Sequence, residues 1–366
     1  MTERKEKNRT VAEEKEWIPE SVPGKRKSPA TLALDYLLRW GLPLALTVLL
    51  VWYMFRKVDF SEMLSILNTG VAYSWILLAM AISVFSHIFR AIRWRIQLRS
   101  LGIEASLMTL VCSIFGCYAL NLIFPRLGEV WRCTYIARER KARFTTVLGS
   151  MVGDRLCDTL MVLSLTVLAF ILSRHAIESF MVKYPVGRDI ASMVAQGWFW
   201  GGVAILCAGV WCLFRFGGNI GIVKKIRGWI AGLWEGFAAL WKMKGKWRFL
   251  ALTFAIWGCY FIQLYVAFFA FGFTRDLCAR PGLAFGLVPC LVAFVLSSIG
   301  MAVPSNGGLG PWNIAIIFGL AVYRIGETEG TAFSMVVWSA QTVMLIMLGV
   351  FTMIYVSKKE SKGSLK

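Results

Sequence analysis

The sequence has little of what metal sites and hydrolytic enzymes use. It contains 2 His, and His87 and His175 stand far apart in the chain. Its 9 Cys lie mostly inside apolar segments and form no Cys-x-x-Cys motif, so we interpret them as small core residues rather than metal ligands or disulfides. No nucleophile stands beside a candidate base. We therefore expect no metal, no cofactor and no enzymatic activity.

Acidic residues are also scarce, with 21 Asp and Glu against 40 Lys and Arg. A net charge of +19 can indicate a nucleic-acid partner. Here the basic residues gather in the loops between apolar segments. Cytoplasmic loops of membrane proteins are rich in Lys and Arg, which accounts for the positive charge without nucleic acid. We expect contact with anionic lipid headgroups and none with nucleic acid.

Apolar residues dominate, at 57% of the chain with 25 Phe and 16 Trp. Several runs are long enough to cross a bilayer. The sequence predicts an all-α polytopic membrane protein with about six full spans plus two re-entrant or broken helical hairpins. The predicted full spans are 38–55, 71–89, 145–173, 192–214, 249–272 and 331–356. Residues 37–357 are expected to form the transmembrane domain, and the polar residues 1–36 and 358–366 to form cytoplasmic tails. We expect residues 1–36 to be disordered and not to be a signal peptide.

The first interrupted element is expected at 105–142. The flanks on both sides are basic, which does not suit a single crossing. We therefore predict a hairpin that turns at Pro125 and returns to the same face. The flanking basic residues are Arg90, Arg93, Arg95 and Arg99 before the element, and Arg126, Arg132, Arg138, Arg140, Lys141 and Arg143 within or after its turn.

The second interrupted element, at 283–323, breaks at the stretch from Pro304 to Pro311, which a helix cannot continue through. Its flanks are nearly neutral, so we expect it to enter from the outer side. The halves 38–173 and 192–356 then form an inverted repeat, with a site where the broken helices meet. Both termini are expected to be cytoplasmic, in the inner or plasma membrane.

Between the predicted spans at 192–214 and 249–272, residues 220–244 have apolar residues at helical spacing among Lys, Arg and Trp. This pattern predicts an interfacial helix. It could gather lipid at the inner leaflet, but a passive connector is the favoured interpretation.

Three charged residues, Asp154, Arg155 and Asp158, lie near the middle of the span at 145–173. Charges at that depth usually line a cavity or pair with one another. A functional role is favoured over the alternative, a local ion pair between Arg155 and Asp158.

The first hairpin tip offers Arg126, Glu129 and Arg132, which would face broadly the same way on a helix. Together with a helix start after Pro125 they could hold a phosphate, or they could only seat the hairpin. For Tyr118 and Asn121, satisfying freed backbone groups is the favoured interpretation.

At the second tip the backbone amides could approach a ligand closely, or the glycines could only permit tight packing. The residues there are Ser305, Asn306, Gly307, Gly308 and Gly310. For the arginines at 90, 93, 95 and 99, positive-inside bias and snorkelling suffice as an explanation.

Four ordered motifs carry a resemblance to a known family. They are Arg90-Ala-Ile-Arg-Trp-Arg95 with Leu98-Arg99, Tyr118-Ala-Leu-Asn121 with Pro125-Arg-Leu-Gly-Glu129 and Arg132, Asp154-Arg-Leu-Cys-Asp158, and Pro304 with Gly307-Gly-Leu-Gly310. This set resembles the flippase-like transmembrane domain of lysylphosphatidylglycerol synthases, over about 38–356. The family often has Pro where Asn306 stands and an acidic residue where Asn313 stands, so a carboxylate role at the second tip does not carry over.

The resemblance implies a membrane protein that moves a lipid, or a lipid-linked polar group, between leaflets. Ten residues follow the last predicted span, so we expect no tRNA-dependent lysine transferase. The resulting hypothesis is a flippase for an anionic phospholipid or a polyprenyl-linked headgroup, working by alternating access. The alternatives are a non-lipid secondary transporter and a membrane scaffold for an envelope-biogenesis enzyme. A homo-oligomer or a lipid-modifying partner enzyme is compatible with all three.

Overall fold

The computed structural model describes residues 42–56, 58–174 and 243–364, with scattered positions between 192 and 209. These residues form helices, and the one β contact among them is an isolated bridge between Val71 and Phe271. The predicted span at 192–214, the interfacial helix at 220–244 and the tail at 1–36 lie wholly or mostly outside the described residues.

The first half of the chain contributes the following helices: α3 (Leu42–Phe55), α4 (Phe60–Thr69), α5 (Tyr73–Ser100), α6 (Leu107–Ile123), α7 (Leu127–Glu139) and α8 (Phe144–Leu172). The second half contributes α13 (Lys246–Phe268), α14 (Gly272–Cys278), the 3-10 turn η2 (Pro281–Leu283), α15 (Leu287–Gly300), the 3-10 turn η3 (Asn306–Gly308), α16 (Pro311–Ala321) and α17 (Glu327–Ser364).

Five segments in the described residues are long and apolar enough to cross a membrane: Tyr73–Ser100, Phe144–Leu172, Lys246–Phe268, Pro281–Gly300 and Glu327–Lys359. Their outer faces are apolar, as Leu77 at 71%, Phe170 at 60% and Met353 at 72% exposure illustrate. Exposed apolar side chains of this kind face lipid rather than water in such a bundle. The prediction of an all-α polytopic membrane protein is confirmed.

Three features of the helices differ clearly from the prediction. α5 continues to Ser100, so the arginines expected at the end of a span stand inside its helix. α17 runs from Glu327 to Ser364, so its last residues continue the helix where a separate tail at 358–366 was expected. The short helix α4 was not predicted, and Asp59 caps its first turn by accepting hydrogen bonds from the amides of Ser61 and Glu62.

The first hairpin consists of α6 and α7. Ser106 caps α6, and the helix stops before Pro125, which has no N–H to continue it. Arg126 then takes a left-handed conformation with φ of 67°, which reverses the chain into α7. Gly128 permits the close return, because a Cβ there would lie 1.9 Å from the Cys117 carbonyl oxygen.

The second hairpin consists of α15 and α16, which pack extensively on each other. Its turn uses positive φ at Gly307, Gly308 and Gly310, and Pro311 opens α16. Asn313 fixes this start, since its side-chain oxygen accepts a hydrogen bond of 3.1 Å from the Gly310 amide.

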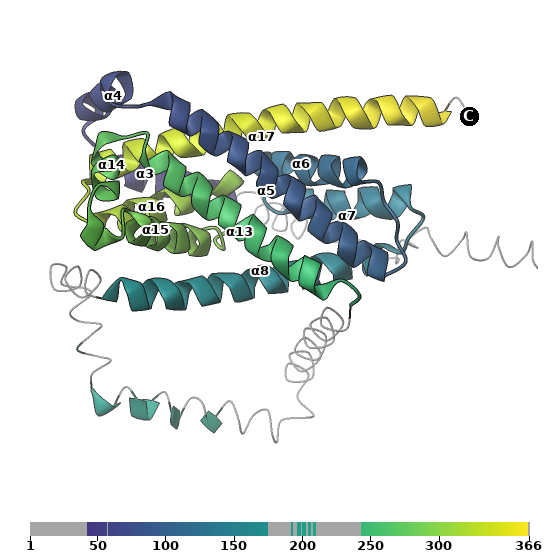
Figure 1. The fold of residues 1–366 in the computed structure, drawn as a ribbon, viewed down its shortest axis with the longest axis horizontal. Coiled ribbons are helices and arrows are strands. Elements are labelled where there is room, and N and C mark those ends of the chain that lie inside the picture. The colour runs from purple at the N-terminus through teal and green to yellow at the C-terminus, as the bar shows by residue number, and fades with distance from the viewer. Residues whose placement is uncertain are drawn as a thin grey trace, which may run out of the picture.

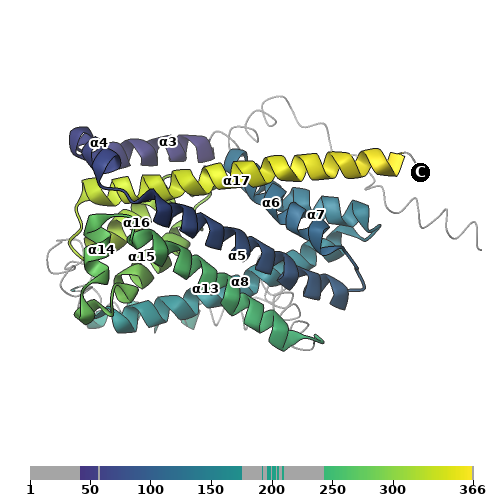
Figure 2. The same cartoon turned by 45° about the horizontal axis from the view of Figure 1, so that its top comes forward.

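The two hairpins open at opposite ends of the molecule (Figures 1 and 2). Residues before α6 and after α7 line one shallow cavity, so both ends of the first hairpin lie together. The second hairpin opens at the end where Tyr323 meets Ser173 and where Tyr265 binds the Phe285 carbonyl. α6 and α7 have 17 and 13 residues, about 25 and 20 Å, which is shorter than the roughly 30 Å bilayer core.

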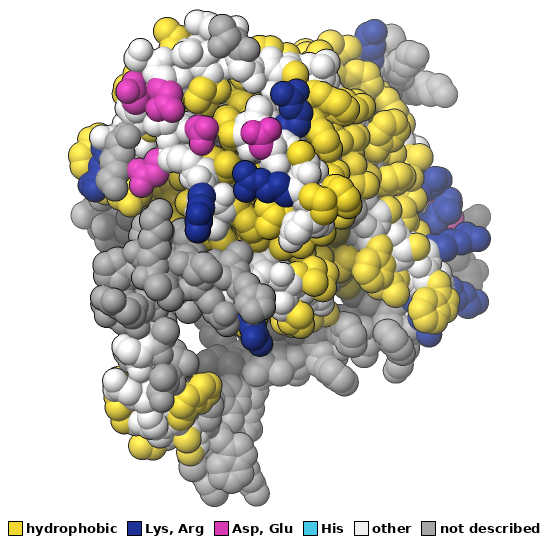
Figure 3. All heavy atoms as spheres, turned by 60° about the vertical axis from the view of Figure 1, so that its left-hand side comes forward, with side chains coloured by type: hydrophobic (Ala, Val, Ile, Leu, Met, Phe, Trp, Pro, Cys, Tyr) yellow, Lys and Arg dark blue, Asp and Glu magenta, His cyan; other side chains and the backbone are white. Residues whose placement is uncertain are grey.

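Charge separates these two ends. The end where α5 stops and α6 begins, the basic end, carries Arg99, Arg138, Arg140, Lys141, Arg143, Lys244, Lys246, Arg248 and Lys358. The opposite end, the near-neutral end, carries Asp59, Glu62, Asp276, Glu327 and Glu329 beside five arginines, Arg56, Arg174, Arg275, Arg280 and Arg324. Figure 3 looks toward the near-neutral end, where Asp and Glu side chains stand among Lys and Arg side chains, while further Lys and Arg cluster at the right-hand margin without this mixture. By the positive-inside rule the basic end is expected to be cytoplasmic.

The halves contact each other reciprocally. α5 packs along its counterpart α13, α6 packs on α17, and α15 packs on α8. The first arm of each hairpin thus lies against the last span of the other half. This exchange is the packing that an inverted repeat produces.

Candidate functional site

The central feature is a buried cluster of four charges between α5 and α8, here called the charged latch. Arg90 and Arg93 come from α5, and Asp154 and Asp158 from α8. Asp158 Oδ2 lies 3.0 Å from Arg90 Nη1, and Asp158 Oδ1 lies 2.9 Å from Arg93 Nη1. Arg93 Nη2 lies 2.8 Å from Asp154 Oδ1. The spacing of three residues on α5 and four on α8 turns both pairs toward one interface.

A third helix, α13, closes the charged latch. The Trp257 indole N–H donates to Asp158 at 3.3 Å, and Arg93 donates to the Thr253 hydroxyl at 3.1 Å. Arg90 donates to the Tyr260 hydroxyl at 3.1 Å. α13 belongs to the other half of the repeat, so the charged latch joins the two halves.

The charged latch is neutral overall and shielded from solvent. Arg93 is fully buried and the Asp154 side chain is 1% exposed. Removing one partner from such a pair costs about 3–5 kcal/mol, because the other charge stays buried and unpaired. Asp154 has the fewest partners, since neither oxygen accepts a hydrogen bond of good geometry from another described residue.

A second ion pair joins α7 to α8, between Glu129 and Arg155. The Arg155 side chain is 48% exposed, whereas that of Glu129 is 18% exposed. Arg155 therefore pairs with Glu129 on the hairpin while Asp158 pairs with Arg90 and Arg93, so the local ion pair between Arg155 and Asp158, the alternative interpretation, is not the arrangement found. This pair stands on the rim of the bundle and is accessible from outside it.

The structure separates the residues of the first hairpin tip. Arg126 is exposed and precedes α7, while Arg132 is buried with its guanidinium 4.5 Å from the Trp94 ring centre. The expectation that Arg126, Glu129 and Arg132 face the same way is therefore wrong. The left-handed Arg126 stands before the helix, so helical spacing does not apply to it.

Asn121 and Tyr118 behave differently from each other. Asn121 accepts a 2.9 Å hydrogen bond from the Gly128 amide, which confirms its expected role in satisfying the freed backbone. The Tyr118 ring lies 5.9 Å from the Arg90 guanidinium carbon and 4.6 Å from the His87 ring centre. Tyr118 thus borders the charged latch.

The second tip meets the first inside the bundle. A Cβ on Gly307 would lie 2.6 Å from the Leu122 side chain at the end of α6. The Gly307 carbonyl accepts from the Trp338 indole at 2.9 Å, and the Ser305 hydroxyl is buried without a partner among the described residues. Asn306, Gly308 and Gly310 complete this turn. The broken helices therefore meet as expected, although their contact is largely one of packing.

A neutral counterpart of the charged latch stands in the second half, here called the amide latch. Gln263 on α13 donates to Gln341 on α17 at 2.8 Å, and Gln341 donates to Ser83 on α5 at 3.1 Å. Gln263 stands 17 positions after Lys246, as Arg90 does after Tyr73. Gln341 stands 14 positions after Glu327, as Asp158 does after Phe144. The two latches occupy equivalent places in the repeat.

The family model for the lysylphosphatidylglycerol synthase TM region matches residues 40–349. The chain belongs to that family. Comparisons with curated proteins and with solved structures found no match.

In this lysylphosphatidylglycerol synthase TM region, sequence reasoning missed half of the charged latch. Arg90 and Arg93 were assigned to snorkelling, yet they are 4% and 0% exposed. One signal was present: two arginines three residues apart in one apolar segment match two aspartates four residues apart in another. Trp257, Tyr260 and the amide latch carried no comparable signal. Among the described residues, no group of three His, Cys, Asp or Glu could hold a metal ion.

Proposed function

We propose that this protein moves a lipid between the leaflets by alternating access. The lipid would be an anionic phospholipid or a lipid-linked polar group. The observation that carries the proposal is the charged latch, in which two arginines and two carboxylates hold three helices of both halves together. Membership of the lipid-related family supports the choice of a lipid over another solute.

In the proposed mechanism a lipid phosphate competes with Asp158 for Arg90 and Arg93. Guanidinium groups bind phosphate and carboxylate with similar forked geometry, so the exchange needs little rearrangement of the arginines. Release from the arginines would leave the carboxylates of the charged latch without their cations. An intramembrane charge without its partner is costly, which couples headgroup binding to opening of the latch.

The rest of the predicted site takes secondary roles in this mechanism. Glu129 and Arg155 would guide the headgroup at the rim, since both remain partly accessible. The touching tips at Leu122 and Gly307 would separate when the bundle opens. The acyl or prenyl chain would stay in lipid along the apolar outer face of α8, where Leu163 and Val167 are exposed.

A dithionite assay with fluorescent phospholipid in proteoliposomes tests this proposal. The purified protein is expected to expose inner-leaflet fluorescent phosphatidylglycerol to the quencher, and Asp158→Asn is expected to abolish the effect. Glu62→Gln, an exposed acid in the first turn of α4, is the matched control and should retain activity. Uptake of small solutes without lipid movement would favour a non-lipid transporter, and an unchanged Asp158→Asn phenotype would favour a scaffold.

A further inference from the structure

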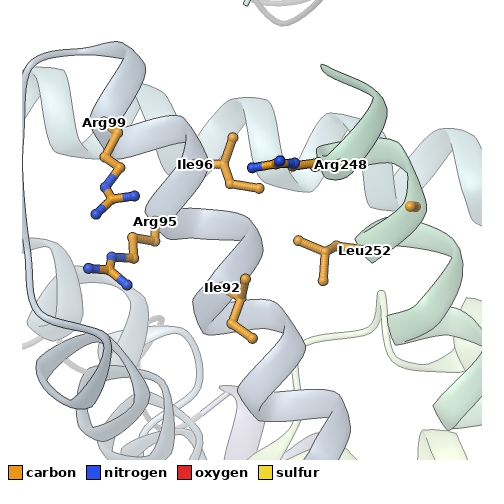
Figure 4. A pocket seen from close by; sticks show the side chains of 7 residues that line it. Ile92, Arg95, Ile96, Arg99, Arg248 and Leu252 are labelled. Atoms are coloured by element: carbon orange, nitrogen blue, oxygen red, sulfur yellow. The ribbon is translucent and has the colours of Figure 1, made fainter. Parts of the chain in front are cut away.

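A groove between α5 and α13 at the basic end carries an amphiphilic lining. Its volume is about 410 Å³, and its basic lining residues are Arg95, Arg99 and Arg248. Ile92, Ile96 and Leu252 supply an apolar surface. In Figure 4, Arg95 and Arg99 project together from the side of α5 away from α13, and Arg248 reaches from α13 toward Ile96 on the other side.

The three arginines are not engaged elsewhere. None of them forms an ion pair or side-chain hydrogen bond with another residue of the described ranges, and no acidic residue lines the groove. The Nε of Arg95 is buried without a hydrogen-bond partner in the same part of the chain. Arg90 and Arg93, nearby on α5, are by contrast paired with carboxylates, although the Nε of each is likewise buried without a hydrogen-bond partner. The groove therefore has uncompensated positive charge.

The order of residues along the groove matches a lipid. Arg99 lies in the last turn of α5 and Arg248 in the first turn of α13, so both stand at the end of the bundle. Ile92 and Leu252 lie deeper, next to Arg93 and Thr253 of the charged latch. Arg95 lies about one turn deeper than Arg99, between Ile92 and Ile96, so positive charge and apolar side chains stand next to each other along the groove. Such a lining suits a phosphate with an attached acyl chain better than a free ion.

We infer that this groove binds a phospholipid with a net negative charge, with the phosphate on Arg95, Arg99 and Arg248 and an acyl chain over Ile92 and Leu252. The site is separate from the charged latch, whose residues do not line it. Binding at the groove is an equilibrium property, so it can be present whether or not the protein transports lipid.

Native mass spectrometry of the full chain in detergent, titrated with dioleoyl phosphatidylglycerol or dioleoyl phosphatidylcholine, tests the inference. The wild type is expected to prefer phosphatidylglycerol. Each arginine replaced by Gln is expected to weaken that binding about fivefold, the effect of one basic side chain near a membrane surface. The variant that combines Arg95→Gln, Arg99→Gln and Arg248→Gln should lose the preference.

The matched control combines Arg138→Gln, Lys141→Gln and Arg143→Gln, which removes equal charge from exposed positions at the same end. It is expected to keep the preference, and an equal loss would overturn a local site. Ala251→Trp should weaken phosphatidylglycerol binding with every arginine present, because it fills the apolar part. If Ala251→Trp has no effect and inorganic phosphate competes as well as the lipid does, the groove is an ion site and the inference is wrong. If the triple variant fails to fold, Arg248→Gln and Ala251→Trp decide the question alone.

Discussion

The charged latch and the amide latch occupy equivalent places in the two halves and differ in chemistry. Both join the fourth element of one half to the paired helices α5 and α13. One uses two arginines and two aspartates, whereas the other uses two glutamines and a serine. The comparison teaches that both halves of the repeat have a polar contact at the same place, and that this contact is ionic in one half and uncharged in the other.

This difference has an energetic consequence. The hydrogen bonds of the amide latch are part-buried, and a typical hydrogen bond contributes about 0.5–1.5 kcal/mol, whereas an uncompensated buried charge costs about 3–5 kcal/mol. We therefore expect the charged latch to hold its side of the bundle more firmly and to open only when an ionic ligand or a proton compensates it. The amide latch is expected to open more readily.

The largest effect is expected from Arg93→Met. This change leaves Asp154 without its cation and Asp158 with Arg90 alone, so stability should fall by about 3–5 kcal/mol. Thermal unfolding in detergent measures the loss. The variant that combines Arg93→Met with Asp154→Leu should recover part of this loss. If Arg93→Met alone costs no more than an exposed ion pair, about 0.2–1 kcal/mol, the interpretation of a buried ion cluster is wrong.

A smaller loss, of about 1–3 kcal/mol, is expected from Gln341→Met, which keeps the volume but removes both hydrogen bonds to Gln263 and Ser83. The same unfolding measurement applies. Gln341→Glu serves as the comparison, since it keeps an acceptor for Gln263 while adding a charge. If Gln341→Met costs as much as Arg93→Met, the two latches do not differ in strength.

Transplanting charge into the amide latch sharpens the comparison further. Gln263→Arg or Gln341→Asp alone should destabilise the protein, while the two together should restore part of the loss, by about 0.5–3 kcal/mol in a double-mutant cycle. Gln263 Nε2 lies 2.8 Å from Gln341 Oε1, so side chains at these two positions can reach each other. Additive losses would show that the two side chains do not meet.

The smallest effect is expected at the surface. Glu139 on α7, itself 16% exposed, pairs with two partly exposed cations, Lys359 on α17 at 40% and Arg140 at 34% exposure. Glu139→Gln should cost about 0.2–1 kcal/mol, and added salt should reduce the difference. Unfolding at low and high ionic strength measures this, and a loss equal to that of Gln341→Met would remove the contrast between exposed and buried contacts.

Much of the fold could be predicted because its signals are local. Proline and glycine mark both hairpin turns, and the basic flanks indicate that both ends of the first hairpin lie together. Asn121 could be predicted for the same reason, since a turn frees amides within a few residues of it.

The charged latch could be predicted only in part because it is assembled from distant segments. The depth of Asp154 and Asp158 in their span could be predicted from the sequence. The span before them was predicted to end at residue 89, but α5 continues to Ser100, so Arg90 and Arg93 lie inside the bundle and not at its end. Arg132 was misplaced for a related reason. Its partner, Trp94, lies on another helix, and no spacing in the sequence indicates that contact.

The inverted repeat itself is tested most directly by labelling single cysteines with an impermeant thiol reagent from each side of the membrane. Glu104→Cys and Arg140→Cys report the two ends of the first hairpin, and Gly282→Cys and Gly326→Cys those of the second, in a functional background without native cysteines. The account predicts that 104 and 140 label from one side and that 282 and 326 label from the other. Labelling of 104 and 140 from opposite sides would mean that the first element crosses the membrane, and would contradict the repeat on which both latches rest.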